Sequence, residues 1–100
     1  MAGGDAVQIA PDVYKVVLED EHVRLLGTRT GPGDSSEMHS HPNMVGYAIS
    51  DCTWALTGPD GTTVLVAVKA GKTVYLDAVD HSARDLGTIG SHDLLIELKK

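Results

Sequence analysis

Apolar and polar residues alternate in short segments along most of this chain of 100 residues. Such alternation predicts β-strands, because successive side chains of a strand point to opposite faces of its sheet. No segment keeps a helical period over three turns. We therefore predict an all-β chain of about eight to ten strands, closed into a barrel or folded into two sheets. The predicted strands span residues 13–18, 22–30, 37–41, 45–49, 52–57, 62–68, 73–76, 81–86 and 94–99.

Turn residues separate the predicted strands at intervals of about eight to twelve positions, which is typical of a β-barrel or sandwich. The clearest hairpin signal is the Gly-Pro-Asp-Gly run at 58–61, where proline presets the turn and glycine accepts a positive φ. The chain also has 23 Val, Ile and Thr residues, whose branched side chains fit a pleated surface. We expect residues 1–12 to form a flexible tail and residues 13–100 to form a single domain.

Charge and composition exclude several classes of partner. The chain has 14 acidic and 8 basic residues, and it lacks the basic stripe of a nucleic-acid-binding protein. No apolar run approaches the ~20 residues of a membrane span, and no secretory signal pattern opens the sequence. The single cysteine, Cys52, cannot form an internal disulfide, so we expect a cytoplasmic protein. We interpret Cys52 as a small apolar residue of a strand, with a reactive thiol as the alternative.

The histidines carry the candidate chemistry. His39 and His41 are separated by one residue, so on a strand both imidazoles point to the same face. Such a pair can chelate a divalent transition metal, although many His-x-His pairs bind none. A third ligand must come from elsewhere, and His81 is best placed, after a turn and at the start of another predicted strand. His22 and His92 lie beside acidic residues and are expected to be solvated bystanders.

The spacing around these histidines resembles the motifs of the cupin superfamily. Gly33, His39 and His41 match the first motif, G-x5-H-x-H-x3,4-E-x6-G, and Gly71 and His81 match the ends of the second motif. More narrowly, the chain is similar to small single-domain bacterial cupins related to the β-alanine degradation protein BauB, on the segments 38–42 and 94–99. The resemblance covers residues 13–98 and implies the cupin fold, a double-stranded β-helix or jelly-roll barrel.

The chain departs from the family pattern at the motif glutamate. That glutamate falls at Val45 or Gly46, and neither can coordinate a metal. The proline and glycine of the second motif are likewise replaced, by Asp77 and Val79. The resemblance therefore implies a metal site of three histidines, which are His39, His41 and His81. Similar sites occur in mononuclear iron dioxygenases, which favours Fe(II), while Zn, Ni, Cu and Mn stay open because imidazole binds them as well.

Other candidate residues surround this predicted site. Glu37 lies two positions before His39, so a regular strand would give it the same face as a fourth ligand or as a group that orients an imidazole. The alternative is that strand twist carries Glu37 to the solvent-exposed rim. Either Asp77 or Asp80 could orient a histidine, with an ordinary surface turn as the alternative. The candidate pocket residues are Met44, Tyr47, Trp54 and Tyr75, and ordinary packing is the alternative for each.

Three functions are consistent with these observations. The first is a metal-dependent enzyme that acts on a small organic or amino-acid-derived molecule, most directly a three-histidine dioxygenase. The second is a non-redox metal-dependent isomerase, lyase or decarboxylase, and the third is a non-catalytic cupin that binds a metal or small ligand. We also expect a homodimer, because a barrel of this size gains by covering its exposed strand edges.

Overall fold

The structure is a computed structural model that describes residues 4–99. Ten β-strands and one short helix make up the described part, so the prediction of an all-β chain with eight to ten strands is confirmed. The elements are β1 (Gly4–Asp5), α1 (Ala6–Ile9), β2 (Tyr14–Glu19), β3 (Val23–Thr30), β4 (Ser35–His41), β5 (Met44–Ala48), β6 (Cys52–Thr57), β7 (Thr63–Val68), β8 (Thr73–Leu76), β9 (Val79–Asp85) and β10 (Ser91–Leu98). The helix has four residues, and no helix among residues 4–99 is long and apolar enough to cross a membrane.

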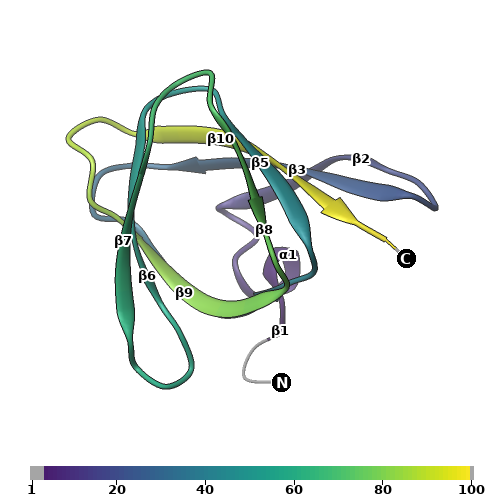
Figure 1. Cartoon of the computed structure of the whole chain (residues 1–100), viewed down its shortest axis with the longest axis horizontal. Coiled ribbons are helices and arrows are strands. Elements are labelled where there is room, and N and C mark those ends of the chain that lie inside the picture. The colour runs from purple at the N-terminus through teal and green to yellow at the C-terminus, as the bar shows by residue number, and fades with distance from the viewer. Residues whose placement is uncertain (1–3, 100) are drawn as a thin grey trace.

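Two five-stranded sheets curl around the centre of the molecule (Figure 1). One sheet has the order β1-β4-β9-β6-β7, and the other has the order β2-β3-β10-β5-β8. Both sheets pair strands that are distant in sequence, since β4 lies beside β9 and β10 lies between β3 and β5. This interleaving brings residues from both halves of the chain to one interior.

Three strands begin two or three residues earlier than their alternation predicts. Ser35 opens β4, Val79 opens β9 and Ser91 opens β10, where the sequence analysis placed the starts at residues 37, 81 and 94. Pairing with a neighbouring strand extends a strand beyond its apolar residues. In β10, for example, Ser91 pairs with Thr30 of β3 in a regular antiparallel ladder. Serine opens β4 and β10, so the apolar pattern does not reveal where these two strands begin. The extension of β10 adds residues 91–93 to the barrel wall.

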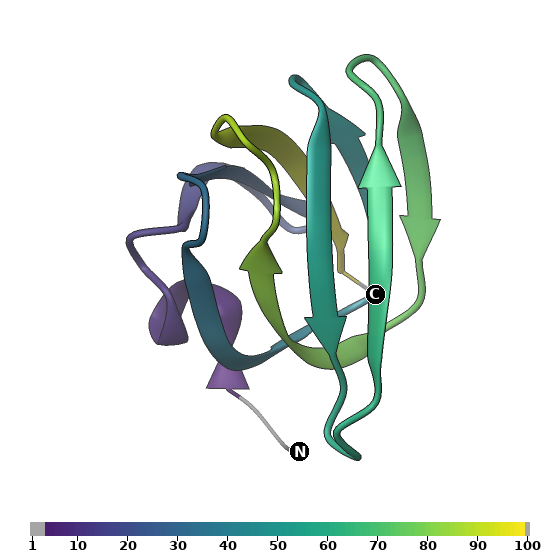
Figure 2. The same ribbon diagram turned by 90° about the vertical axis from the view of Figure 1, so that its left-hand side faces the viewer.

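The amino-terminal segment is part of the barrel, so the expected tail over residues 1–12 is wrong for residues 4–12. Gly4 and Asp5 pair in parallel with β4, and α1 packs beside the same strand, as Figure 2 shows. The Asp5 carboxylate caps the helix by accepting a hydrogen bond from the Val7 amide at 3.2 Å. Ala6 is fully buried in the core. A helix of four residues is too short to leave a periodic signal in the sequence, and residues 1–3 lie outside the described part.

The apolar core is small and occupies one side of the interior. The buried apolar residues that pack together are Ala6, Ala10, Tyr14, Leu26, Met44 and Leu95. The chain has no phenylalanine, and Tyr14 is the one aromatic ring in this group of buried residues. Polar side chains fill much of the remaining interior. Asp85, for example, is 1% exposed and accepts hydrogen bonds from the Thr30 hydroxyl at 2.7 Å and the Gly87 amide at 2.8 Å.

The homodimer expected from the sequence remains a prediction. Apolar side chains stand exposed on two edge strands, with Val17 of β2 61% exposed and Leu65 of β7 73% exposed. Edge strands of this kind can pair with a second chain. Light scattering should therefore give twice the mass of one chain, and Val17→Lys or Leu65→Lys should shift the mass toward the monomer. A monomeric mass for the unmodified protein would refute the dimer.

Candidate metal site

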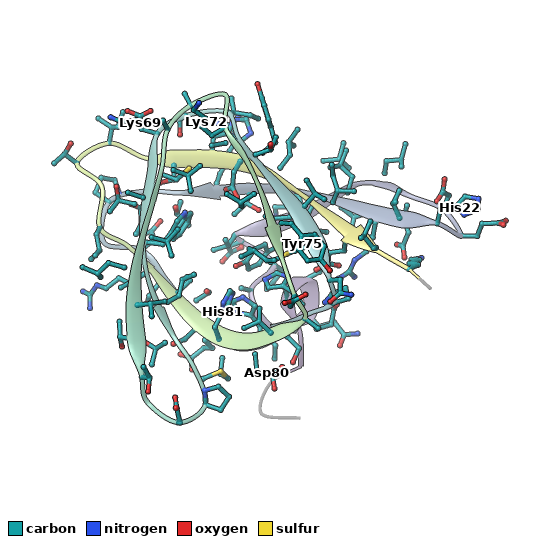
Figure 3. All side chains as sticks on the ribbon, in the orientation of Figure 1. His22, Lys69, Lys72, Tyr75, Asp80 and His81 are labelled. Atoms are coloured by element: carbon teal, nitrogen blue, oxygen red, sulfur yellow. The ribbon has the colours of Figure 1, made fainter. Side chains whose placement is uncertain are left out.

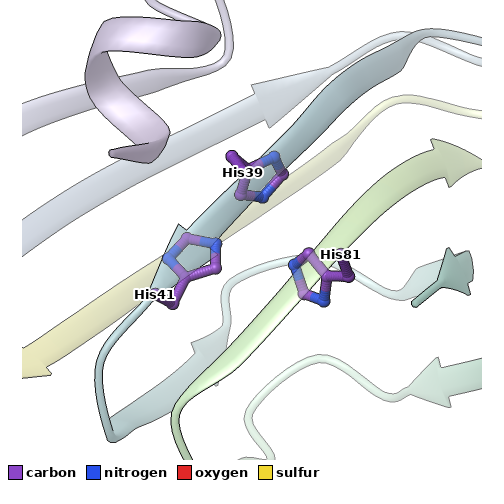
Figure 4. A group of neighbouring side chains, drawn as sticks. All are labelled: His39, His41 and His81. Atoms are coloured by element: carbon purple, nitrogen blue, oxygen red, sulfur yellow. The ribbon is translucent and has the colours of Figure 1, made fainter. Parts of the chain in front are cut away.

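Three buried histidines meet on two adjacent strands. The antiparallel pairing of β4 with β9 sets His39 opposite His81, and His41 lies two residues along β4 on the same face. The ring centroids are 4.8 Å apart for His39 and His41, 4.9 Å for His39 and His81, and 5.3 Å for His41 and His81. One nitrogen of each ring lies within 4.8 Å of the others. Figure 4 shows the three rings turned toward one another, so the structure brings together the three residues predicted as ligands.

A bulge in β4 decides which side chains join this cluster. The pairing of β4 with β9 shifts register between Ser36 and His39, and both of these residues are buried although they are three positions apart. The strand therefore does not keep its alternation through Glu37, whose side chain is exposed. Of the two alternatives for Glu37, the structure therefore shows the solvent-exposed position, and the carboxylate does not join the cluster as a ligand or as a group that orients an imidazole. Only its backbone takes part in the site.

Hydrogen bonds fix the orientation of the His39 ring. Its Nδ1–H donates to the backbone oxygen of Glu37 at 2.7 Å, and the Tyr14 hydroxyl donates to Nε2 at 3.1 Å. The ring of Tyr14 also stands edge-on to the imidazole, with the centroids 5.1 Å apart. The backbone contact selects the tautomer in which Nε2 carries the lone pair that accepts the Tyr14 hydroxyl.

A buried carboxylate orients His41 in the same way. The Nδ1–H of His41 donates to Oε2 of Glu97 at 2.8 Å, and Glu97 is 2% exposed. Arg24 balances this carboxylate by donating from Nε to Oε1 of Glu97 at 2.8 Å. The guanidinium of Arg24 also pairs with Asp5 of β1. An ionic chain thus runs from the amino-terminal strand to a histidine of the cluster.

The electrostatic setting of the cluster favours neutral imidazoles. Burial lowers the pKa of His81 to about 4, with a further contribution from the neighbouring His39 and His41 rings. Burial also lowers the pKa of His39 below its usual value. These two rings are therefore uncharged at neutral pH, which is the form that binds a metal.

The residues present fit a transition-metal ion. His39 and His41 each use Nδ1 for a hydrogen bond to a backbone oxygen or carboxylate, so Nε2 is the nitrogen that could coordinate. At His39 a metal would take the place of the hydrogen bond from the Tyr14 hydroxyl. His81 supplies a third imidazole from the facing strand. The donor set of three nitrogens suits iron, zinc, copper and nickel, so it defines a class of metal rather than one element.

An apolar cavity of about 150 Å³ lies beside the histidines. His41 and His81 form part of its wall, and Met44, Tyr47 and Trp54, which were candidate pocket residues, line it as well. Tyr75 does not line it and is 56% exposed. The alternation of β8 explains this difference from the prediction, because the neighbours of Tyr75 in β8 face the cavity and turn the Tyr75 ring outward.

The other candidates lie outside the cluster. His22 is at the tip of the β2–β3 hairpin, far from His81 in Figure 3, with its side chain 77% exposed. His92 pairs with Arg29 in the ladder of β10 and β3 and is absent from the cavity wall. Asp80 accepts a hydrogen bond from the Ser40 hydroxyl at 2.5 Å, while Asp77 is exposed.

Sequence reasoning missed four residues that shape the site, namely Tyr14, Arg24, Asp93 and Glu97. Glu97 had a detectable signal, because it alternates with Leu95 in an otherwise apolar strand and so occupies an inward position. Its partners come from β3 and β4, and no spacing in the sequence reveals that contact. Asp93 lies before the predicted start of β10, and it lines the cavity with its Oδ1 buried and unpartnered.

Replacement of Asp93 by Asn should remove a pH-dependent loss of stability. Burial raises the pKa of Asp93 from 3.8 to about 7, so between these values the folded state holds a proton that the unfolded chain has lost. The free energy of unfolding therefore falls as pH rises through this range. Urea unfolding at about pH 4 and about pH 8 should show Asp93→Asn gaining stability relative to the unmodified protein as pH rises.

The exposed Asp12 provides the control for this measurement. Asp12→Asn should follow the unmodified protein at both pH values. If Asp93→Asn also shows the same pH dependence as the unmodified protein, the Asp93 carboxyl is not protonated in the folded state.

Proteins similar to this chain are found among solved structures and not among curated sequences or family models. No protein-family model matches the chain, and a search of curated proteins finds no matching sequence. Among solved structures, a cupin domain from Bordetella pertussis Tohama I is similar over 100% of this chain and 99% of its own, with 20% identity and a TM-score of 0.80.

Two further solved structures have the same architecture. An RmlC-like cupin family protein from Methanocaldococcus jannaschii has a TM-score of 0.68 and 16% identity, over 87% of this chain and 79% of its own. A cupin superfamily protein from Desulfitobacterium hafniense DCB-2 has a TM-score of 0.64 and 11% identity, over 88% and 77% of the two chains. Likeness at these identities concerns the fold alone, and the narrower BauB-like resemblance stays a prediction. The chain has the cupin fold, a double-stranded β-helix.

Proposed function

We propose that this protein is a metal-dependent enzyme that acts on a small organic molecule, with the metal held by His39, His41 and His81. The observation that carries the proposal is the buried cluster of these rings at the wall of an apolar cavity. A structural role alone does not account for three imidazoles at this position, because burying polar rings side by side costs free energy that packing does not return. A metal would compensate that cost.

Within this class we favour a dioxygenase. Three imidazole ligands with no carboxylate leave coordination positions open, and the cavity wall beside them is largely apolar. Ferrous iron bound there would supply one-electron chemistry with O₂. The cavity of about 150 Å³ limits the substrate to a compact molecule, since an apolar cavity of about that size holds benzene. An amino-acid-derived substrate of a few carbons is consistent with that limit.

The hydroxyl of Tyr14 is the group of this chain best placed to assist such a reaction. It lies 3.1 Å from Nε2 of His39, and it also lines the cavity. Burial raises the pKa of Tyr14, so the hydroxyl keeps its proton at neutral pH. Tyr14 can therefore donate a hydrogen bond to a substrate oxygen that becomes negatively charged beside the histidines. Met44 and Trp54 close the apolar side of the same space.

A non-redox isomerase, lyase or decarboxylase is the second candidate. The three imidazoles suit zinc and nickel as well as iron, and a protonated tyrosine beside them suits acid catalysis on a polarised carbonyl. A cupin that binds metal or ligand without turnover is the third. Metal identity divides these candidates, because bound iron with O₂ consumption indicates the dioxygenase and tightly held zinc with activity under argon indicates the second class.

Removal of one histidine should remove most of the metal. Protein purified without added metal should contain about one transition-metal ion per chain by elemental analysis. We expect His41→Ala and His81→Ala to lose most of that metal while circular dichroism still reports the β-barrel. His81→Ala is the cleaner variant, because it leaves the contact between His41 and Glu97 in place.

The matched control is His22→Ala, whose side chain is exposed at the hairpin tip. That variant should keep the full metal content. An unchanged metal content in His81→Ala would overturn the assignment of the site, and so would the absence of any transition metal from the unmodified protein after incubation with iron or zinc.

The Glu97 carboxylate should contribute to metal affinity without touching the metal. Glu97→Gln removes the negative charge that accepts the Nδ1–H of His41. A carboxylate in this position orients the imidazole and strengthens it as a ligand, and its loss weakens metal binding by about 10–100-fold. Competition with a chelator measures the affinity, with the exposed Glu21→Gln as control. An affinity for Glu97→Gln equal to that of the control would show that this carboxylate serves only the barrel.

A further inference from the structure

Asp93 and Glu97 share the inward face of β10 but differ in their hydrogen-bond partners. Alternation along this strand gives Asp93, Leu95 and Glu97 one face, and all three are turned toward the interior. The carboxylate of Glu97 is paired with Arg24 and His41. The carboxyl group of Asp93 has a buried Oδ1 with no hydrogen-bond partner among the described residues. Among residues 4–99, both carboxylate oxygens of Glu97 thus have partners, whereas Oδ1 of Asp93 has none.

A second unpartnered polar atom lies next to Asp93. Thr28 of β3 is its direct partner in the ladder of β10 and β3, and cross-strand neighbours of this kind have side chains on the same face of the sheet. Thr28 is 2% exposed, and its hydroxyl oxygen also lacks a hydrogen-bond partner among residues 4–99. Both residues line the apolar cavity that reaches His41 and His81. Buried polar atoms without partners are rare, and two of them in one cavity wall indicate a ligand that satisfies them.

We propose that Asp93 and Thr28 form a subsite for the ammonium group of a small amine whose apolar body fills the cavity. The proposal rests on the proposed function in one respect, since it places the other end of that molecule at the histidines. It names the substrate class more narrowly, as a compact primary amine or an amino-acid-derived molecule with a free amino group.

The acceptor atoms of Asp93 and Thr28 in the cavity wall favour a cationic ligand. A carboxylate and a hydroxyl oxygen offer acceptors, and an ammonium group offers three N–H donors together with a positive charge. No lysine or arginine lines the cavity in the described part of the chain, so the protein supplies no cation of its own to Asp93. Arg24 is already engaged by Asp5 and Glu97. The ligand is then the remaining source of positive charge.

The burial of the Asp93 carboxyl group also favours a cationic ligand. It raises the pKa of Asp93 to about 7, because no charged group compensates the carboxylate in the apolar wall. A bound ammonium group would favour the ionised carboxylate, as an opposite charge at short distance does. The other titratable side chains that line this cavity are Tyr14, Tyr47, Cys52, His41 and His81.

Binding of matched probes tests the subsite. The probes are n-butylammonium, n-butanol and n-butyrate, which share an apolar body and differ in the polar end. The protein is first dialysed against a chelator, so that no amine nitrogen can bind a metal, and affinities are measured by calorimetry. We expect n-butylammonium to bind at least about tenfold more tightly than n-butanol, which is the effect of a charge-assisted hydrogen bond in a buried site.

Substitutions locate the selectivity. Asp93→Asn should reduce the affinity for n-butylammonium by about tenfold or more and leave n-butanol within about twofold. Thr28→Val, which removes the hydroxyl at nearly constant shape, should reduce the affinity for the amine by about threefold. Asp12→Asn, on the exposed surface, is the control and should bind all probes as the unmodified protein does.

Any of four results would overturn the subsite. They are equal affinity for the amine and the alcohol, tighter binding of butyrate, amine selectivity that survives in both Asp93→Asn and Thr28→Val, and absence of saturable binding by n-butylammonium. The test does not depend on the metal, so a protein that selects the amine but holds no metal would refute the proposed function and keep the subsite. A protein that holds the metal without selecting the amine would refute the subsite and keep the proposed function.

Discussion

The pairing of β4 with β9 is the constraint on which the rest of this structure depends. Its register sets His39 opposite His81, and a slip of one residue would turn one of these imidazoles to the outer face. The bulge before His39 adjusts the strand so that both halves of β4 keep buried positions, and it removes Glu37 from the interior. The cluster is thus a product of strand pairing between residues about 40 positions apart, and the local His-x-His spacing supplies only two of its three members.

The interior of this barrel holds many buried polar side chains, and burying each of them costs free energy unless it is hydrogen-bonded. Asp85 and Glu97 are compensated through several short hydrogen bonds, and the histidines are compensated in part through Glu37, Glu97 and Tyr14. The apolar residues that remain gather around α1 and leave an apolar space beside the histidines. That space is the cavity on which the proposed activity relies.

Alternation and turn residues were sufficient to predict the strands, and family spacing was sufficient to identify the three histidines. The sequence left two positions open for Glu37, because a period of two gives it the inward face and only the bulge, which the sequence does not reveal, turns it to solvent. Asp93 and Glu97 were missed because their importance comes from strands that neighbour β10 in space, while the sequence around them shows only an apolar segment with two acids. The amino-terminal segment was missed for a different reason, since one turn of helix and a two-residue strand are too short to produce a pattern.

The amino-terminal strand has a practical consequence for anyone who produces this protein. Asp5 is hydrogen-bonded to Arg24, Arg24 to Glu97 and Glu97 to His41, so the chain start is three contacts away from a histidine of the cluster. An affinity tag or fusion partner joined to that end would lie within a few residues of Asp5, the first member of this series of contacts. Lys99, near the other end, contacts Glu19 and the backbone of His22 at the hairpin, well away from the cluster. A carboxyl-terminal tag with a cleavable linker is therefore the safer choice for metal analysis.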